Sequence, residues 1–165
     1  TYDFGKKETY ISSKNIERSH VWSKNVMVGF GVKEIPPAGG SKYRVSSLSF
    51  NMMKVRAEKS SFGFGTDFFY NSSLSDLIAK DSAGTSRKLD NFRVGLIGVY
   101  SFDFGKISAS LGLGAYLLSN YKEDGVVYNK LEARYAFTDQ LFLRVAMKTH
   151  FAVADFVTYG IGYKF

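Results

Sequence analysis

The sequence predicts an antiparallel β-barrel whose strands cross a bacterial outer membrane. Apolar and polar residues alternate with a period of two, the signature of half-buried strands. The alternating runs have ten or more residues, whereas soluble strands have about five or six and a strand crossing a bilayer needs about 9–11. Short turns alternate with long loops along the chain, as in outer-membrane barrels. About eight runs are expected, giving a complete barrel or the C-terminal arc of a larger one.

The composition restricts the class of protein further. Hydrophobic residues make up 45% of the 165 residues, yet the mean hydropathy is −0.13 because polar residues are interleaved with them. No run approaches the roughly 18 apolar residues of a transmembrane helix. The absence of cysteine excludes disulfides and thiolate metal sites. A net charge of +7 suits nucleic acid, anionic lipid headgroups, or lysines in loops and lumen; we expect no nucleic-acid partner and no cofactor.

The chain divides into a lead-in segment and one barrel domain. Residues 1–21 are expected to be the end of an upstream strand plus a linker, and 22–165 the transmembrane barrel. The chain opens without an initiator methionine or an apolar signal region, so we expect a signal peptide to have been removed upstream. The expected strands are 22–35, 43–57, 60–73, 90–104, 107–119, 125–138, 141–151 and 155–165.

The two faces of these strands differ in chemical character. One face is almost purely apolar and is expected to meet lipid, and the other is small, polar or charged and is expected to line the lumen. The alternative is a soluble lipocalin-like barrel, which is apolar inside and polar outside. The residues expected to face lipid are Phe30, Leu96, Leu111, Leu113, Val145 and Ile161, and those expected to face inward are Arg93, Glu132, Arg134 and Lys148.

The last strand favours the membrane interpretation. Tyr159, Ile161, Tyr163 and Phe165 place apolar or aromatic residues at every second position up to the final phenylalanine. This pattern resembles the C-terminal signal by which outer-membrane assembly machinery recognises its clients. The expected location is therefore the bacterial outer membrane, with its lipid, its lipopolysaccharide and the barrel-assembly machinery as partners.

Aromatic residues and one long connection complete the predicted topology. The segment 72–90 is rich in Ser, Asp and Lys, has no periodicity, and is predicted to be the longest loop. Aromatic residues near strand ends are predicted to form interfacial girdles; these are Tyr70, Tyr100, Phe102, Phe104, Tyr116, Tyr121, Tyr128, Tyr135 and Tyr163.

Charged residues on the inward face are expected to meet in the lumen. The turn at 138–140 sets a hairpin register that places Glu132 opposite Ala146 and diagonal to Arg144 and Lys148, within reach of long side chains. Such a cluster is either a proton relay or anion site, or a charge network that fills a narrow lumen. Eight strands leave room only for side chains, which favours the network. Its expected members are Arg93, Lys130, Glu132, Arg134, Arg144 and Lys148.

Five stretches of the chain, 31–37, 43–49, 67–74, 147–156 and 159–165, resemble the acyloxyacyl hydrolase group of Bacteroidetes, relatives of the lipid A 3-O-deacylases. The resemblance implies an outer-membrane barrel that hydrolyses an ester-linked acyl chain of lipid A. It also implies a serine nucleophile, a histidine base and an acidic residue that orients the histidine.

The expected catalytic motif is incomplete in this chain. The deacylases carry H-x-S-N on a late strand, and here the matching segment from His150 has alanine at position 152, in the place of the serine. Asp155 could form a His–Asp dyad with His150, although an aspartate that caps a turn is the more ordinary role. His20 and Ser23 are expected in a solvated lead-in rather than as a catalytic pair.

Two functional hypotheses follow. The first is a lipid A deacylase-like esterase whose nucleophile comes from elsewhere. The second is a non-catalytic structural or partner-binding barrel, for example a subunit of a larger outer-membrane complex.

Overall fold

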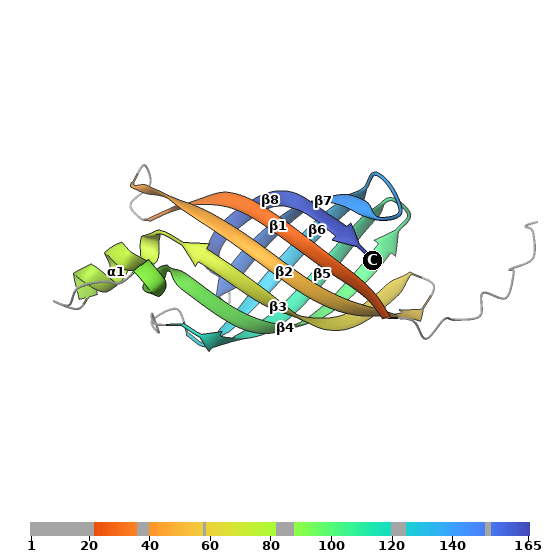
Figure 1. Ribbon diagram of the computed structural model, residues 1–165, viewed down its shortest axis with the longest axis horizontal. Coiled ribbons are helices and arrows are strands. Elements are labelled where there is room, and N and C mark those ends of the chain that lie inside the picture. Colours follow the sequence, from red (N-terminus) through yellow and green to blue (C-terminus); the bar gives the residue numbers. More distant parts are fainter. Residues whose placement is uncertain (1–21, 36–39, 58, 82–87, 120–124, 151–152) are drawn as a thin grey trace, which may run out of the picture.

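Eight antiparallel strands close into a barrel (Figure 1). The computed structural model describes residues 22–35, 40–57, 59–81, 88–119, 125–150 and 153–165; the predicted lead-in segment and His20 lie outside them. β1 pairs with β8, so these residues form a closed barrel and not an arc. The strands are β1 (Trp22–Glu34), β2 (Lys42–Ala57), β3 (Ser60–Asn71), β4 (Phe92–Phe104), β5 (Ile107–Leu118), β6 (Val127–Ala136), β7 (Leu141–His150) and β8 (Val153–Lys164).

The predicted strands are confirmed, each boundary to within two residues. Tight turns join β2 to β3, β4 to β5 and β6 to β7 at one end of the barrel, here called the turn end. Gly105 takes a φ of 69° in the turn between β4 and β5, a conformation that glycine adopts without steric cost. The opposite end, called the loop end, carries the connections from β1 to β2, β3 to β4, β5 to β6 and β7 to β8.

One prediction about the connections is wrong. The segment 72–90 contains helix α1 (Ser73–Asp81) and a short 3-10 helix, η1 (Lys88–Asn91). The side-chain oxygen of Asn71 accepts hydrogen bonds from the backbone nitrogen and hydroxyl of Ser73, at 3.0 and 2.7 Å, and so satisfies a free donor at the helix start. Leu74 is fully buried. Within the described residues, no helix is long and apolar enough to cross a membrane.

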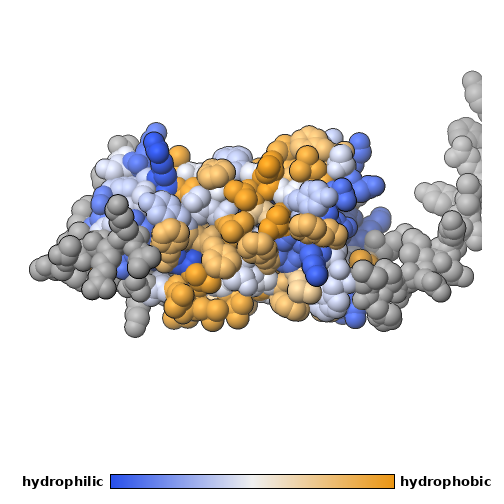
Figure 2. All heavy atoms as spheres, viewed as in Figure 1, coloured by the Kyte–Doolittle hydropathy of each residue, from blue (hydrophilic) through white to orange (hydrophobic). Residues whose placement is uncertain are grey.

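The predicted division into outward-facing and inward-facing side chains is confirmed. Phe30 is 66% exposed and Leu113 62%, whereas Arg93 is 2% exposed. Figure 2 shows apolar side chains gathered across the middle of the barrel on the face in view, with hydrophilic residues toward both ends. The barrel is therefore the inverse of a soluble lipocalin-like one. The other tested residues follow the same division: Leu96, Leu111, Val145 and Ile161 are exposed, while Glu132 and Lys148 are buried and the side chain of Arg134 is nearly so.

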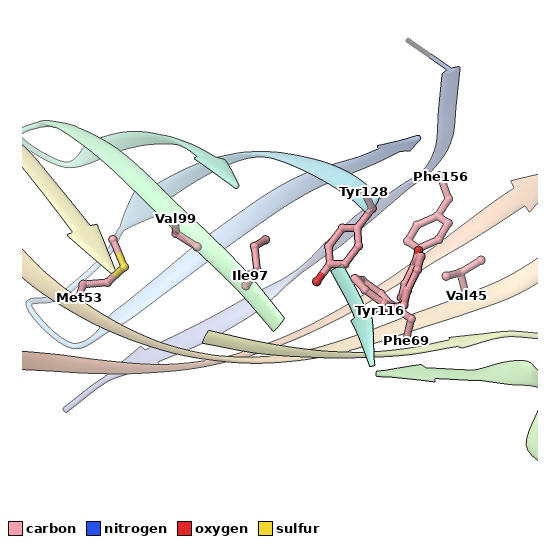
Figure 3. Close-up of a cluster of buried hydrophobic side chains, with 8 residues drawn as sticks. All are labelled: Val45, Met53, Phe69, Ile97, Val99, Tyr116, Tyr128 and Phe156. Carbon is pink, nitrogen blue, oxygen red and sulfur yellow. The ribbon is translucent and has the colours of Figure 1, made fainter. Parts of the chain in front are cut away.

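An aromatic cluster fills the lumen toward the loop end. Figure 3 shows the rings of Phe69, Tyr116, Tyr128 and Phe156 gathered beside Val45. Tyr116 and Tyr128 stack with their ring centroids 4.8 Å apart. Their assignment to an interfacial girdle is wrong, because both lie at inward positions of their strands and are buried.

Candidate functional site in the barrel lumen

A β-bulge in β8 brings Asp155 into the lumen. The register of β7 with β8 pairs Lys148 with Phe156 but Thr149 with Ala154, which leaves Asp155 as an extra residue. Such a bulge lets one strand redirect a side chain out of simple alternation. The prediction that Asp155 caps a turn is wrong, because it lies within β8 with its side chain 3% exposed.

Asp155 is the centre of a cluster near the loop end. It accepts a hydrogen bond from Lys148 Nζ at 2.6 Å and a second from Lys33. Its Oδ2 also lies 3.7 Å from His150 Nδ1, and His150 Nε2 lies 3.0 Å from the Tyr116 hydroxyl. A carboxylate, an imidazole and a hydroxyl thus follow one another in the order of a hydrolytic triad, but the hydroxyl is a phenol instead of a serine.

The ammonium group of Lys148 lies inside an aromatic cage. Its Nζ is 4.8 Å from the ring centroid of Phe156, with three further rings at 5.1, 5.3 and 5.9 Å, those of Phe69, Tyr116 and Tyr128. Aromatic faces attract a cation, the more so when it is removed from water. Together with Asp155 they compensate the burial of a lysine that is only 2% exposed. Lys148 is thereby held in place and occupies the space that the rings surround.

A second cluster surrounds Asp67, which is fully buried. Its carboxylate accepts hydrogen bonds from Ser49 Oγ at 2.6 Å, from Lys130 Nζ at 2.7 Å and from the Tyr128 hydroxyl at 2.9 Å. Lys130 comes from β6, on the far side of the barrel from β3. The three donors satisfy the carboxylate without water, as a buried charge requires.

A third cluster lies toward the turn end. Glu132 Oε1 pairs with Arg134 Nε at 2.5 Å and Oε2 with Arg144 Nη2 at 2.9 Å. The predicted position of Glu132 opposite Ala146 is confirmed, and so is its contact with Arg144. Lys148, which was expected to share Glu132, pairs with Asp155 instead.

Sequence reasoning placed its six lumenal charges inside the barrel but missed five other residues of the clusters in which these charges lie. Arg93, the remaining member, lies with its guanidinium 5.1 Å from the ring centroid of Tyr116. The missed residues are Lys33, Ser49, Asp67, Tyr116 and Tyr128. Each lies at an inward position in the alternation of its strand, so the sequence pattern could have predicted that its side chain enters the lumen.

The arrangement fills most of the lumen with paired charges and aromatic rings. A cavity of about 380 Å³ opens at the turn end, lined among others by Ser61, Ser101, Arg134 and Phe142. The described residues hold no group of three or more His, Cys, Asp or Glu side chains placed to bind a metal ion. The chemistry that these contacts offer is charge neutralisation and proton exchange between Asp155, His150 and the Tyr116 hydroxyl.

A closed antiparallel β-barrel with an apolar exterior and an ionic interior has the architecture of outer-membrane β-barrels. The family model of the acyloxyacyl hydrolase C-terminal domain matches residues 22–165. The chain therefore belongs to this family, which confirms the resemblance to acyloxyacyl hydrolases found in the sequence. A search of curated proteins gives no significant match.

Several solved structures are similar to this chain. One is a designed transmembrane β-barrel, with 14% identity, a TM-score of 0.49, and coverage of 88% of this chain and 96% of the other. Neisserial surface protein A shows 12% identity and a TM-score of 0.41, covering 87% and 94%. Ail of Yersinia pestis, solved with the heparin analogue sucrose octasulfate, shows 10% identity and a TM-score of 0.38, covering 87% and 99%. At such identities, the functions of these proteins are not carried over.

Proposed function

We propose that the barrel is embedded in a bacterial outer membrane. The observation that supports this is the apolar exterior of a closed barrel, where residues such as Phe64, Leu117 and Ile161 are more than half exposed. A soluble protein rarely exposes an apolar patch larger than a few hundred Å², whereas the hydrocarbon core of a membrane favours such a surface. Closure pairs every strand edge, which satisfies the backbone groups that lipid cannot.

We also propose that this barrel serves the hydrolysis of an ester-linked acyl chain of lipid A, with the nucleophile supplied from outside this chain. Family membership supports the activity. His150 and Asp155 are candidates for the base and its orienting acid, since Asp155 lies 3.7 Å from one imidazole nitrogen. The other nitrogen faces the phenol of Tyr116 at 3.0 Å, and position 152, where the deacylases carry the serine, is alanine in this chain.

The test compares the native protein in outer-membrane vesicles with this 165-residue chain folded in detergent. The native protein should release fatty acid from lipid A and react with a serine-directed fluorophosphonate probe at a residue outside this chain. The isolated chain should do neither. Release of fatty acid by the isolated chain, abolished by His150→Ala, would show that this chain holds the complete site.

The second candidate is a non-catalytic structural or partner-binding barrel. It is favoured by the engagement of Asp155 with two lysines, Lys33 and Lys148, which leaves its carboxylate committed to neutralising charge. Native protein that neither releases fatty acid nor reacts with the probe would support this candidate against the first.

We further propose that β8 presents the signal recognised by the barrel-assembly machinery. The side chains of Tyr159, Ile161, Tyr163 and Phe165 point outward and are between 37% and 71% exposed. They form an apolar row along one face of the terminal strand, as the sequence pattern predicted.

A further inference from the structure

Gly98 differs from every other glycine in the described strands. At each of the others, an added Cβ would lie less than 3.0 Å from a neighbouring atom, so packing against the lumen or a strand excludes a side chain. At Gly98, the nearest such atom is the Leu113 carbonyl oxygen at 3.9 Å. Gly98 also lies on the exposed face of β4. Steric crowding therefore does not account for a glycine at position 98. The missing side chain leaves a hollow in the outer surface of the barrel.

The hollow over Gly98, called the Gly98 groove from here on, lies between large apolar side chains. It is formed by two adjoining depressions of about 690 and 430 Å³ that share Gly98 and Leu113. Clefts of about 300–1,000 Å³ are the usual size for small-ligand binding. The walls are exposed apolar side chains, including those of Phe64, Leu96, Leu111, Leu113 and Leu131.

One end of the Gly98 groove is polar but uncharged. Gly98 is paired with Leu113, Leu113 with Asn129, and Asn129 with Thr149, so one row of residues runs across four strands. Asn129 and Thr149 line the larger depression, close to the loop end of the barrel. Among the described residues that line the two depressions, none is a lysine or an arginine. This pair offers hydrogen bonds to a neutral group such as an ester, and no cation for a phosphate.

We propose that the Gly98 groove binds one acyl chain of a diacyl glycerophospholipid, with the ester linkage at Asn129 and Thr149. The proposal rests on the membrane embedding proposed above. An acyl chain is a narrow, flexible apolar cylinder that can follow a groove between protruding side chains. A glycolipid with several phosphates would lack a cationic partner in the lining.

The experiment measures lipid retention by native mass spectrometry of the full chain in detergent, titrated with palmitoyl-oleoyl phosphatidylethanolamine. The unsubstituted chain should retain one lipid per barrel. Gly98→Phe fills the groove, and it should weaken binding at least about tenfold. Gly98→Val gives a second filling variant with a side chain that suits strands. The matched control is Val28→Phe, which adds bulk to an exposed position of β1, away from the groove.

Folding of each variant is checked by the heat-dependent gel mobility of the barrel. Weaker retention in the folded Gly98 variants, with normal retention in the control, supports the proposal. Equal retention in all variants overturns it, and so does a dimer that Gly98→Phe dissociates, or preferential retention of lipid A over the phospholipid. None of these readouts depends on fatty-acid release, so a failure of the proposed hydrolysis is distinguished from a failure of the groove.

Discussion

Replacement of Asp67 by asparagine should remove a large part of the stability of the barrel. The substitution keeps the shape of the side chain but removes the negative charge that Lys130 contacts at 2.7 Å. The lysine side chain is 4% exposed and the aspartate 0%, so the ammonium would remain buried without a counterion. Breaking a buried pair from one side costs about 3–5 kcal/mol, which is a large fraction of the roughly 5–15 kcal/mol that stabilises a typical domain.

A second substitution in the same variant separates charge from packing. Asp67→Asn combined with Lys130→Met removes both charges, and it should recover most of the lost stability because replacing a whole buried pair is often close to neutral. Ser49→Ala removes one hydrogen bond to the carboxylate, at 2.6 Å in the structure, and should cost only about 1.5–3 kcal/mol. Recovery of stability in the double variant would show that the uncompensated charge of Lys130, and not lost packing, causes the effect of Asp67→Asn.

The assay is the urea-induced unfolding of the barrel in lipid vesicles, followed by gel mobility and far-UV circular dichroism. The unfolding free energy is compared between the unsubstituted chain and the three variants. The reasoning is refuted if Asp67→Asn changes stability by less than about 1 kcal/mol. It is also refuted if the double variant is as unstable as Asp67→Asn alone.

Three further predictions concern the imidazole, the strand seam and the last residue. His150→Ala should lower the urea midpoint of the isolated chain, and neither form should release fatty acid from lipid A when assayed by mass spectrometry; release that needs His150 contradicts this. Gly160→Ala should prevent folding, since its Cβ would lie 1.8 Å from the Val28 carbonyl oxygen; a variant with normal gel mobility argues against the packing described. Phe165→Ser should fold normally in detergent but reach the outer membrane in reduced amount, as measured by cell fractionation, and unchanged delivery contradicts the assembly role.

The strands and their sides were predictable from sequence because successive side chains of a strand point to opposite faces. Any departure from that alternation was not predictable. The bulge inserts one residue, so that Asp155 and the next residue, Phe156, both face inward, and the sequence around them carries no mark of the insertion. Helix α1 has apolar residues at 74, 77 and 78, the spacing of a helical face, but nine residues are too few to make that period stand out.

Contacts between adjacent strands were predictable, and those across the lumen were not. The hairpin of β6 and β7 fixes a register, and this placed Glu132 beside Arg144. Asp67 and Lys130 lie on strands that are not neighbours in the sheet, so their contact depends on how the closed barrel is staggered. Lys33 meets Asp155 only because β1 pairs with β8. Tyr116 and Tyr128 were assigned to the interfacial girdle because they lie near strand ends. Their inward position in the alternation of each strand was the stronger indication of where their side chains lie.

The account depends most on which face of the sheet meets lipid. Because the chain has no cysteine, single cysteines at Phe30, Leu111 and Ile161 can carry spin labels without background. A fourth label at Ser108, which lines the cavity at the turn end, reports the interior. In reconstituted vesicles, oxygen should relax the three outer labels and a water-soluble nickel chelate should relax the label at Ser108. Outer labels that respond to the nickel chelate and not to oxygen would contradict membrane embedding of this barrel.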